Sequence, residues 1–289
     1  MTGSKTFETV EPIAVTLSLN VADIRISAGE RTDTVVTVTP NDASKKGDVE
    51  AAEQTRIEFS GGRLLVKAPR SWKHYTLLKF GRESVHVSIE LPAGSTLDGE
   101  AWVGDLSCSG RLGECRYTTG AGDIRLERAG PVDIKTGAGR VSVDLVEGRS
   151  EITGSGPMRL GEVQGPAVVK NQNGAIWIGL AAGDLRCSSA NGDISVDRAL
   201  GALEAKTANG DVHVGEVVRG MVALKTAYGR LEIGIREGTA ALLDVSSSFG
   251  RVENSLSSSD GPQASDETVQ LRAHTSYGDI VIRRSREEV

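Results

Sequence analysis

Apolar and polar residues alternate over short segments that repeat along most of the chain. Each segment begins at a glycine, with apolar residues two and four places after it and mostly polar residues between them. Nineteen of the twenty residues at those two places are apolar, and the exception is Asn254. An alternation with a period of two predicts strands with one buried face and one face in water. The repeated glycines are Gly104, Gly122, Gly139, Gly156, Gly174, Gly192, Gly210, Gly229, Gly250 and Gly278.

The spacing of these glycines predicts a repeat protein. Successive glycines are 18, 17, 17, 18, 18, 18, 19, 21 and 28 residues apart. In most units a second glycine follows about nine residues after the first and precedes another short apolar segment. We therefore expect a unit of about 18 residues that holds two short strands and two tight corners.

Such units can form a coil, in which each unit lies on the previous one, or an antiparallel meander. Three places before the repeated glycine, nine units carry a small hydroxyl or amide residue: Thr119, Thr136, Thr153, Asn171, Ser189, Thr207, Thr226, Ser247 and Thr275. A hydrogen-bonded ladder along one edge of a coil explains why this residue type returns once per unit. The sequence thus favours an all-β solenoid, resembling a single-stranded β-helix, with the repeated apolar residues as its core.

The first hundred residues are strand-like but lack the repeat. A polar connection at 41–54 interrupts them, and a helical turn is expected at 49–53. The ends of a stack of strands expose unpaired edges. We interpret residues 1–100 as an N-terminal β-sheet that caps the solenoid and continues into it.

The solenoid is expected to span residues 101–284, with a polar loop at 254–267. Segments 269–273 and 279–283 are predicted as its last strand pair. A charged tail at 285–289 follows them and would protect the final edge.

Composition restricts the partners and the location. The net charge of −6 argues against nucleic acid, because binding to phosphates depends on an excess of Lys and Arg. The first twelve residues hold no basic-then-apolar signal region, and no apolar run reaches the roughly twenty residues that span a bilayer. Three cysteines, an odd number, fit a reducing compartment. We expect a cytoplasmic protein without a transmembrane segment.

Aspartate follows the repeated glycine in five units, at Asp105, Asp123, Asp193, Asp211 and Asp279. A column of stacked carboxylates suggests a calcium-binding β-roll as one alternative. Other units carry Arg140, Arg230 or Arg251 at the same place, so the column has mixed sign. We expect the carboxylates to accept hydrogen bonds from corner amides, and no metal or other cofactor is predicted.

The remaining potentially reactive residues fit a role in packing better than a catalytic or metal-binding role. Cys108, Cys115 and Cys187 occupy inward places, where a thiol is inert. The four histidines show no metal-ligand spacing. An outward group of Asp193, Asp211, Arg186, Lys206 and His213 supports a second alternative, a carbohydrate-active enzyme that uses the outer sheet.

Two features suit a binding surface. A basic segment interleaved with aromatic residues would bind an anionic partner or a membrane headgroup surface, or else would be a packed hairpin. It comprises Lys67, Arg70, Trp72, Lys73, Tyr75, Lys79 and Arg82. Tyr228, Phe249 and Tyr277 share the place before the repeated glycine in late units. They would offer a stacking surface to a sugar or peptide, or shield the end of the solenoid.

An ordered set of motifs marks a family resemblance. These are the opening FETVEPIAVTLSLNVADIRISAGERTDTVVTVTP, the link VHVSIELPAGSTL, the repeats TGAGDI, SANGDISV and TANGDVHVGEV, and the closing HTSYGDIVIRR. Over residues 6–284 the chain resembles the bacterial "putative adhesin" family of β-strand-repeat proteins, a domain of unknown function. The resemblance implies a β-helix-like stack and names no ligand, catalytic residue or metal ligand.

The predicted function is therefore a non-enzymatic, rigid binding or scaffold platform, adhesin-like by resemblance. Its partner would be a protein or a glycan, and it would be a monomer or an end-to-end homo-oligomer.

Overall fold

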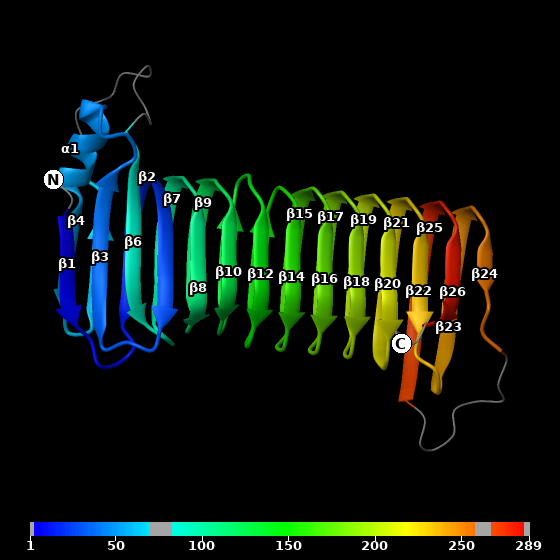
Figure 1. Ribbon diagram of the computed structural model, residues 1–289. Helices are drawn as coiled ribbons and strands as arrows, with labels where there is room; N and C mark the ends of the chain where they lie inside the picture. The colour runs from blue at the N-terminus through cyan, green and yellow to red at the C-terminus, as the bar shows by residue number, and fades with distance from the viewer. Residues whose placement is uncertain (1–2, 70–82, 258–266, 286–289) are drawn as a thin grey trace. The chain divides into compact units, whose positions relative to one another are not determined.

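The computed structural model describes residues 3–69, 83–257 and 267–285. The chain divides into two compact units, residues 1–142 and 143–289. Apart from a helix, α1 (Lys46–Gln54), the regular elements of the described residues are β-strands, and the repeat strands pair in parallel (Figure 1). The predicted all-β, solenoid-type architecture is confirmed.

In the first unit, the helical turn expected at 49–53 is a helix of nine residues. The strands of this unit are β1 (Gly3–Glu8), β2 (Ala14–Gly29), β3 (Asp33–Pro40), β4 (Arg56–Ser60), β5 (Arg63–Lys67), β6 (Val85–Pro92), β7 (Thr96–Val103), β8 (Leu106–Leu112), β9 (Cys115–Ala121), β10 (Ile124–Ala129) and β11 (Val132–Thr136). The next strand along the chain, β12 (Val141–Val146), includes the point at which the two units divide.

These strands form two sheets, in the spatial orders β1–β3–β6–β2–β8–β10 and β4–β5–β2–β7–β9–β11. The 16-residue β2 belongs to both, because its first half pairs in one sheet and its second half in the other. The outermost strands, β1 and β4, are joined across the sheets by stacked Phe7 and Phe59 rings, 4.9 Å apart. Lys5 Nζ adds a hydrogen bond of 2.9 Å to the Ile57 carbonyl oxygen. This end of the first unit is therefore closed by side chains.

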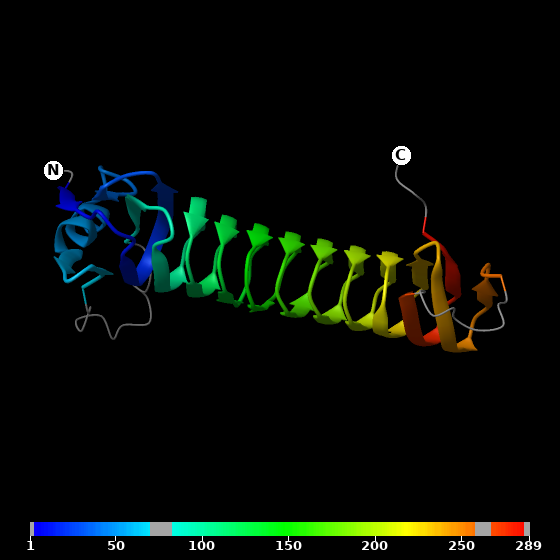
Figure 2. The same cartoon turned by 90° about the horizontal axis from the view of Figure 1, so that it is seen from below.

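The second unit consists of stacked parallel strands. They are β13 (Ser150–Gly154), β14 (Met158–Val163), β15 (Ala167–Asn173), β16 (Ile176–Ala181), β17 (Leu185–Asn191), β18 (Ile194–Ala199), β19 (Leu203–Asn209), β20 (Val212–Val217), β21 (Gly220–Tyr228), β22 (Leu231–Ile235), β23 (Thr239–Phe249), β24 (Val252–Asn254), β25 (Glu267–Tyr277) and β26 (Ile280–Arg284). We call β14–β16–β18–β20–β22–β26–β24 sheet A, and β13–β15–β17–β19–β21–β25–β23 sheet B. Figure 2 shows the strands of the two sheets on opposite sides of this unit.

The apolar residues of the repeat form the core between the sheets. In sheet A, Ile176 pairs with Ile194 and Ile194 with Val212, and these side chains are at most 1% exposed. The predicted ladder of small polar residues is also present. Thr207 Oγ1 donates to the Gly192 carbonyl oxygen at 3.0 Å, and Thr226 and Thr275 make the corresponding bonds in later units at 2.9 and 3.0 Å. Burial and this ladder both fix the stacking register.

The last units do not stack in chain order. Strands β25 and β26 lie between β21–β22 and β23–β24, as the red β26 between β22 and the orange β24 shows in Figure 1. The predicted last strand pair, segments 269–273 and 279–283, is present as the last two strands of the chain, but it is the penultimate pair in the stack. Arg284, expected in or beside a protective tail, donates to the carbonyl oxygens of Arg236 and Thr239 at 2.8 and 2.9 Å.

Asn254 supplies the physical reason for this order. In chain order its side chain would be buried in the core between Ile233 and Ile282, where an amide has no partner to bond. In the observed order β24 is outermost and Asn254 is exposed, whereas Ile280 and Ile282 of β26 are fully buried. The order thus removes the one polar residue of the repeat positions from the core.

One aromatic ring is enclosed in the core of the first unit. Tyr117 is fully buried on β9 and lies opposite Gly99 of β7, where an added Cβ would come within 2.9 Å of the ring. Burial raises the pKa of the Tyr117 hydroxyl, and within the described ranges this hydroxyl has no hydrogen-bond partner.

Replacing Tyr117 with phenylalanine removes an unsatisfied polar atom and keeps the ring. We expect the free energy of unfolding to stay the same or to rise by about 1 kcal/mol, measured by chemical denaturation. Tyr117→Leu, which also loses ring contacts, is the control and should destabilise by about 1–2 kcal/mol. A clear loss of stability in Tyr117→Phe would show that the hydroxyl is hydrogen-bonded, against this interpretation.

Candidate binding surface on sheet B

Three exposed aromatic rings form a continuous stack at the C-terminal ends of neighbouring strands. Tyr228 on β21 stacks on Tyr277 of β25 with ring centroids 5.0 Å apart, and Tyr277 stacks on Phe249 of β23 at 4.8 Å. The planes differ by only 3° and 8°. We call this set the aromatic column. Its spatial order, Tyr228–Tyr277–Phe249, follows from the inserted position of β25.

The column forms because parallel, in-register strands place equivalent residues about 4.8 Å apart, which suits stacked planar groups. The same corner carries an asparagine ladder on earlier strands. Asn191 Nδ2 donates to Asn173 Oδ1 at 3.0 Å, and Asn209 Nδ2 donates to Asn191 Oδ1 at 2.9 Å. Because the rings cover one another, a ligand meets their edges and hydroxyl groups. Among the described residues, no ring stacks on the outer face of Phe249.

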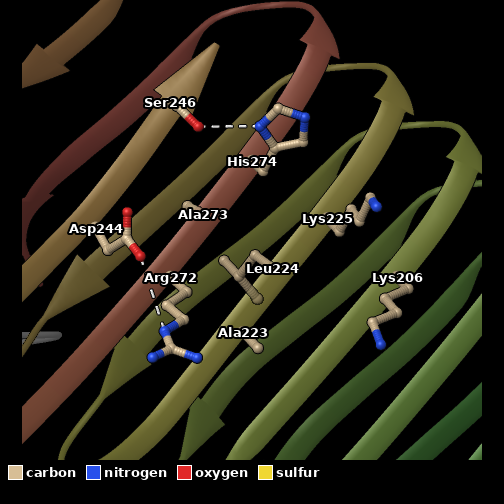
Figure 3. Close-up of a pocket in the computed structure, with 9 residues that line it drawn as sticks. All are labelled: Lys206, Ala223, Leu224, Lys225, Asp244, Ser246, Arg272, Ala273 and His274. Atoms are coloured by element: carbon tan, nitrogen blue, oxygen red, sulfur yellow. Dashed lines mark hydrogen bonds and ion pairs between the residues drawn. The ribbon is translucent and has the colours of Figure 1, made fainter.

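A shallow groove of about 290 Å³ lies on the outer face of sheet B, on β19 and on the three strands of the aromatic column, a few residues before the column (Figure 3). We call it the basic groove. Its lining residues come from β19, β21, β25 and β23: Lys206, Ala223, Leu224, Lys225, Asp244, Ser246, Arg272, Ala273 and His274. Ala223 explains the hollow, since its small side chain lies in register between Glu204 and Arg272, which are much longer.

Register brings the polar side chains of the basic groove into one row. Lys206 is paired with Lys225, Lys225 with His274, and His274 with Ser246, on four neighbouring strands. Ser246 Oγ and His274 Nδ1 are 3.0 Å apart. Figure 3 shows these side chains projecting from the same face of the sheet.

The groove carries more positive than negative charge. Arg272 Nε lies 3.8 Å from an Asp244 carboxylate oxygen, and Lys206 pairs with Glu204. The Lys206 ammonium holds the pKa of the Glu204 carboxyl below its usual range. Lys225 has no carboxylate partner within the part of the chain that the structure describes. An anionic group could therefore bind Lys225 without displacing an existing ion pair.

Comparison with protein families identifies the chain. A family model described as Toastrack DUF4097 matches residues 13–288. The chain belongs to this family. The assignment confirms the resemblance to a family of unknown function that the sequence motifs indicated.

Solved structures similar to the Toastrack chain cover almost its whole length. A putative adhesin from Parabacteroides merdae is 11% identical, covers 97% of this chain and 95% of its own, and has a TM-score of 0.41. A putative adhesin from Bacteroides fragilis is 14% identical, with coverages of 98% and 97% and a TM-score of 0.39. A protein from Parabacteroides distasonis described as a putative lipid binding protein is 11% identical, with coverages of 99% and 97% and a TM-score of 0.33. The search of curated proteins gave no match.

The basic segment predicted from sequence is largely outside the described residues. In the Toastrack chain, Lys67 ends β5 and is half-buried. The other members lie outside the described residues: Arg70, Trp72, Lys73, Tyr75, Lys79 and Arg82. Their role as a binding site or as a packed hairpin stays a prediction.

The aspartates at the corners are used in the stacking. Asp193 Oδ1 accepts a hydrogen bond of 2.8 Å from the backbone N–H of Asp211, and Asp211 Oδ1 accepts one of 2.7 Å from Arg230. Asp123 and Asp279 make the same bond to the N–H groups of Arg140 and Arg251. The expectation that these carboxylates bond corner amides is confirmed. Within residues 3–69, 83–257 and 267–285, no cluster of three or more His, Cys, Asp or Glu could hold a metal ion.

The outward residues considered for an enzyme do not meet at one place. Arg186 and Lys206 are on sheet B, but His213 is on β20 of sheet A, on the opposite side of the unit. Cys108, Cys115 and Cys187 are buried free thiols, as predicted, and burial raises the pKa of Cys115 and of Cys187 to about 12. No helix among the described residues is long and apolar enough to cross a membrane.

Sequence reasoning found the aromatic column and missed the basic groove. Lys206, Lys225 and His274 stand one place before the small polar residue of their units, at Thr207, Thr226 and Thr275. That shared place was a usable signal for a row of cationic side chains. The place of Arg272 and His274 beside Ala223 and Lys225 could not be predicted, because β25 lies next to β21 only through the exchanged order of the last units.

Proposed function

We propose that this Toastrack protein is a non-enzymatic binding platform that holds an anionic partner on the outer face of sheet B. The observation that carries the proposal is Lys225, a cation without a carboxylate partner among the described residues, at the centre of the basic groove. The aromatic column supplies exposed rings a few residues further along β21, β25 and β23. Charge together with exposed aromatic groups is typical of surfaces that bind extended, charged ligands.

The partner that fits is an extended glycan or protein segment bearing carboxylate, sulfate or phosphate groups. Successive strands present Lys206, Lys225 and His274 at intervals of about 4.8 Å, so a ligand lying across the strands meets one polar side chain after another. The repeat unit that we infer, about 18 residues with two short strands, keeps these side chains on a rigid frame. A preorganised surface loses little entropy on binding.

The test measures binding of a carboxylated polysaccharide, polygalacturonate, by isothermal titration calorimetry at low salt. Uncharged dextran of similar length and an acidic peptide are the comparison ligands. We expect the double variant Lys206→Gln/Lys225→Gln to weaken polygalacturonate binding by about tenfold or more, because two charge-assisted contacts are lost. Phe249→Ala should weaken it less.

Lys170→Gln is the matched control, since Lys170 is an outward lysine on β15 of the same sheet and outside the basic groove. It should bind as the unchanged protein does. Equal binding by the groove variant and the control, or hydrolysis of the polysaccharide by the unchanged protein, would contradict the proposed function.

We further propose that the platform works in the cytoplasm. The three free, buried thiols support a reducing compartment. Cell fractionation followed by immunoblotting tests this location.

A further inference from the structure

Strand β23 is a long edge strand that pairs with a neighbour on one side only. It has eleven residues, Thr239–Phe249, and its described pairing is with β25. The N–H and C=O groups of its other edge are without a strand partner within the described residues. Such an edge accepts an additional strand, and natural proteins protect it with proline, inward charges or short length. β23 has none of these protections.

The core is incomplete at the same place. Leu243 and Val245 on β23 point inward but are only half-buried, whereas Leu271 and Ala273, the residues they pair with on β25, are each 1% exposed. Val252 on β24 is 46% exposed, although its counterpart Ile280 on β26 is fully buried. This outermost pair of strands therefore lacks one apolar layer that every inner pair has.

We propose that a second copy of this chain covers the edge, with β23 of the two copies paired antiparallel about a two-fold axis. A two-fold dimer of edge strands is necessarily antiparallel, and it uses the same surface on both partners. Each copy supplies what the other lacks, namely a hydrogen-bonding edge and a row of inward apolar side chains. The first unit explains a discrete pair, because its outer strands β1 and β4 are closed by Phe7 and Phe59.

The side chains favour an axis at Leu243. Directly opposed residues of an antiparallel pair lie on the same face, so the axis must pass midway between the two copies of one β23 residue. An axis at Asp244 would oppose two carboxylates, which is unfavourable. An axis at Val245 would place Leu243 against Ser247 of the other copy. An axis at Leu243 opposes Leu243 with its own copy and Ala241 with Val245, which completes the apolar layer.

Sedimentation equilibrium over a concentration series tests the dimer. We expect the unchanged protein to be a dimer at micromolar concentrations and Leu243→Lys to be at least tenfold weaker in association, because an inward charge blocks the edge. Met221→Lys is the matched control, because Met221 is a 52% exposed residue of β21 away from the edge. A monomer at all concentrations, or equal association of Leu243→Lys and Met221→Lys, would overturn the proposal.

Single-cysteine substitutions test the register independently of stability. The three natural cysteines are buried and do not interfere. Under mild oxidation, Leu243→Cys should give a disulfide-linked dimer, since a residue on the axis opposes itself. Asp244→Cys and Val245→Cys should remain largely unlinked. Preferential linkage at either of those two residues would overturn the proposed pairing.

Discussion

Gly192→Ala is expected to lower the free energy of unfolding of the second unit by about 4 kcal/mol, among the largest effects of a single substitution. Gly192 has a backbone φ of +141°, which residues other than glycine rarely adopt. A Cβ at this position would overlap the carbonyl oxygen of Gly174 in the neighbouring unit. The backbone fixes the position of the Cβ, and the oxygen it meets is a backbone atom, so no rotamer change relieves the clash. Urea denaturation followed by circular dichroism measures the loss.

Gly238→Ala is the control that separates backbone angle from overlap. Gly238 also has a positive φ, +76°, but nothing lies within 4 Å of its added Cβ. It should therefore cost only about 1 kcal/mol. If both variants lost the same stability, the close approach of Gly174 would not be the cause, and the account of the corners given above would be wrong.

Ile282→Asn is expected to cost about 3–4 kcal/mol. Ile282 is fully buried on β26, and its replacement loses apolar contacts while placing an amide where no partner is available. The same amide is tolerated at Asn254 because β24 is outermost. A shift in the urea midpoint at unchanged slope reports the loss.

Asn254→Ile is the reciprocal control and should leave stability unchanged or slightly higher. The two substitutions exchange the same residue types at paired positions on β24 and β26. A destabilising effect of similar size in both variants would refute the idea that Asn254 determines which strands lie outermost.

Local pattern was enough to predict most of the fold. Alternation around the repeated glycines placed residues such as Ile194 and Val212 in the core, and the position of Thr207 and Thr226 predicted the hydrogen-bonded ladder. Both features depend on interactions between equivalent residues of neighbouring units. In a periodic sequence, the spacing of the repeat alone shows which residues are equivalent and therefore interact.

The order of the last units was beyond that reasoning. Segments 239–254 and 267–284 carry the same strand pattern, so periodicity does not show which of the two segments pairs with β21 and β22. The distinction depends on the burial of one residue, Asn254, and on a chain connection that passes an entire unit. The basic groove depends on the same exchange, because Arg272 and His274 lie beside Ala223 and Lys225 only when β25 is next to β21. The site was therefore less predictable than the core.

The inserted position of β25 and β26 has a consequence for biosynthesis. The ribosome releases β23 and β24 before the strands that separate them from β21 and β22 have been made. The native arrangement can be completed only after β25 and β26 have been made, when this newer segment enters between two older ones. Assembly of these last layers therefore departs from the order of synthesis, whereas the preceding layers of the second unit can be added one by one as the polypeptide emerges.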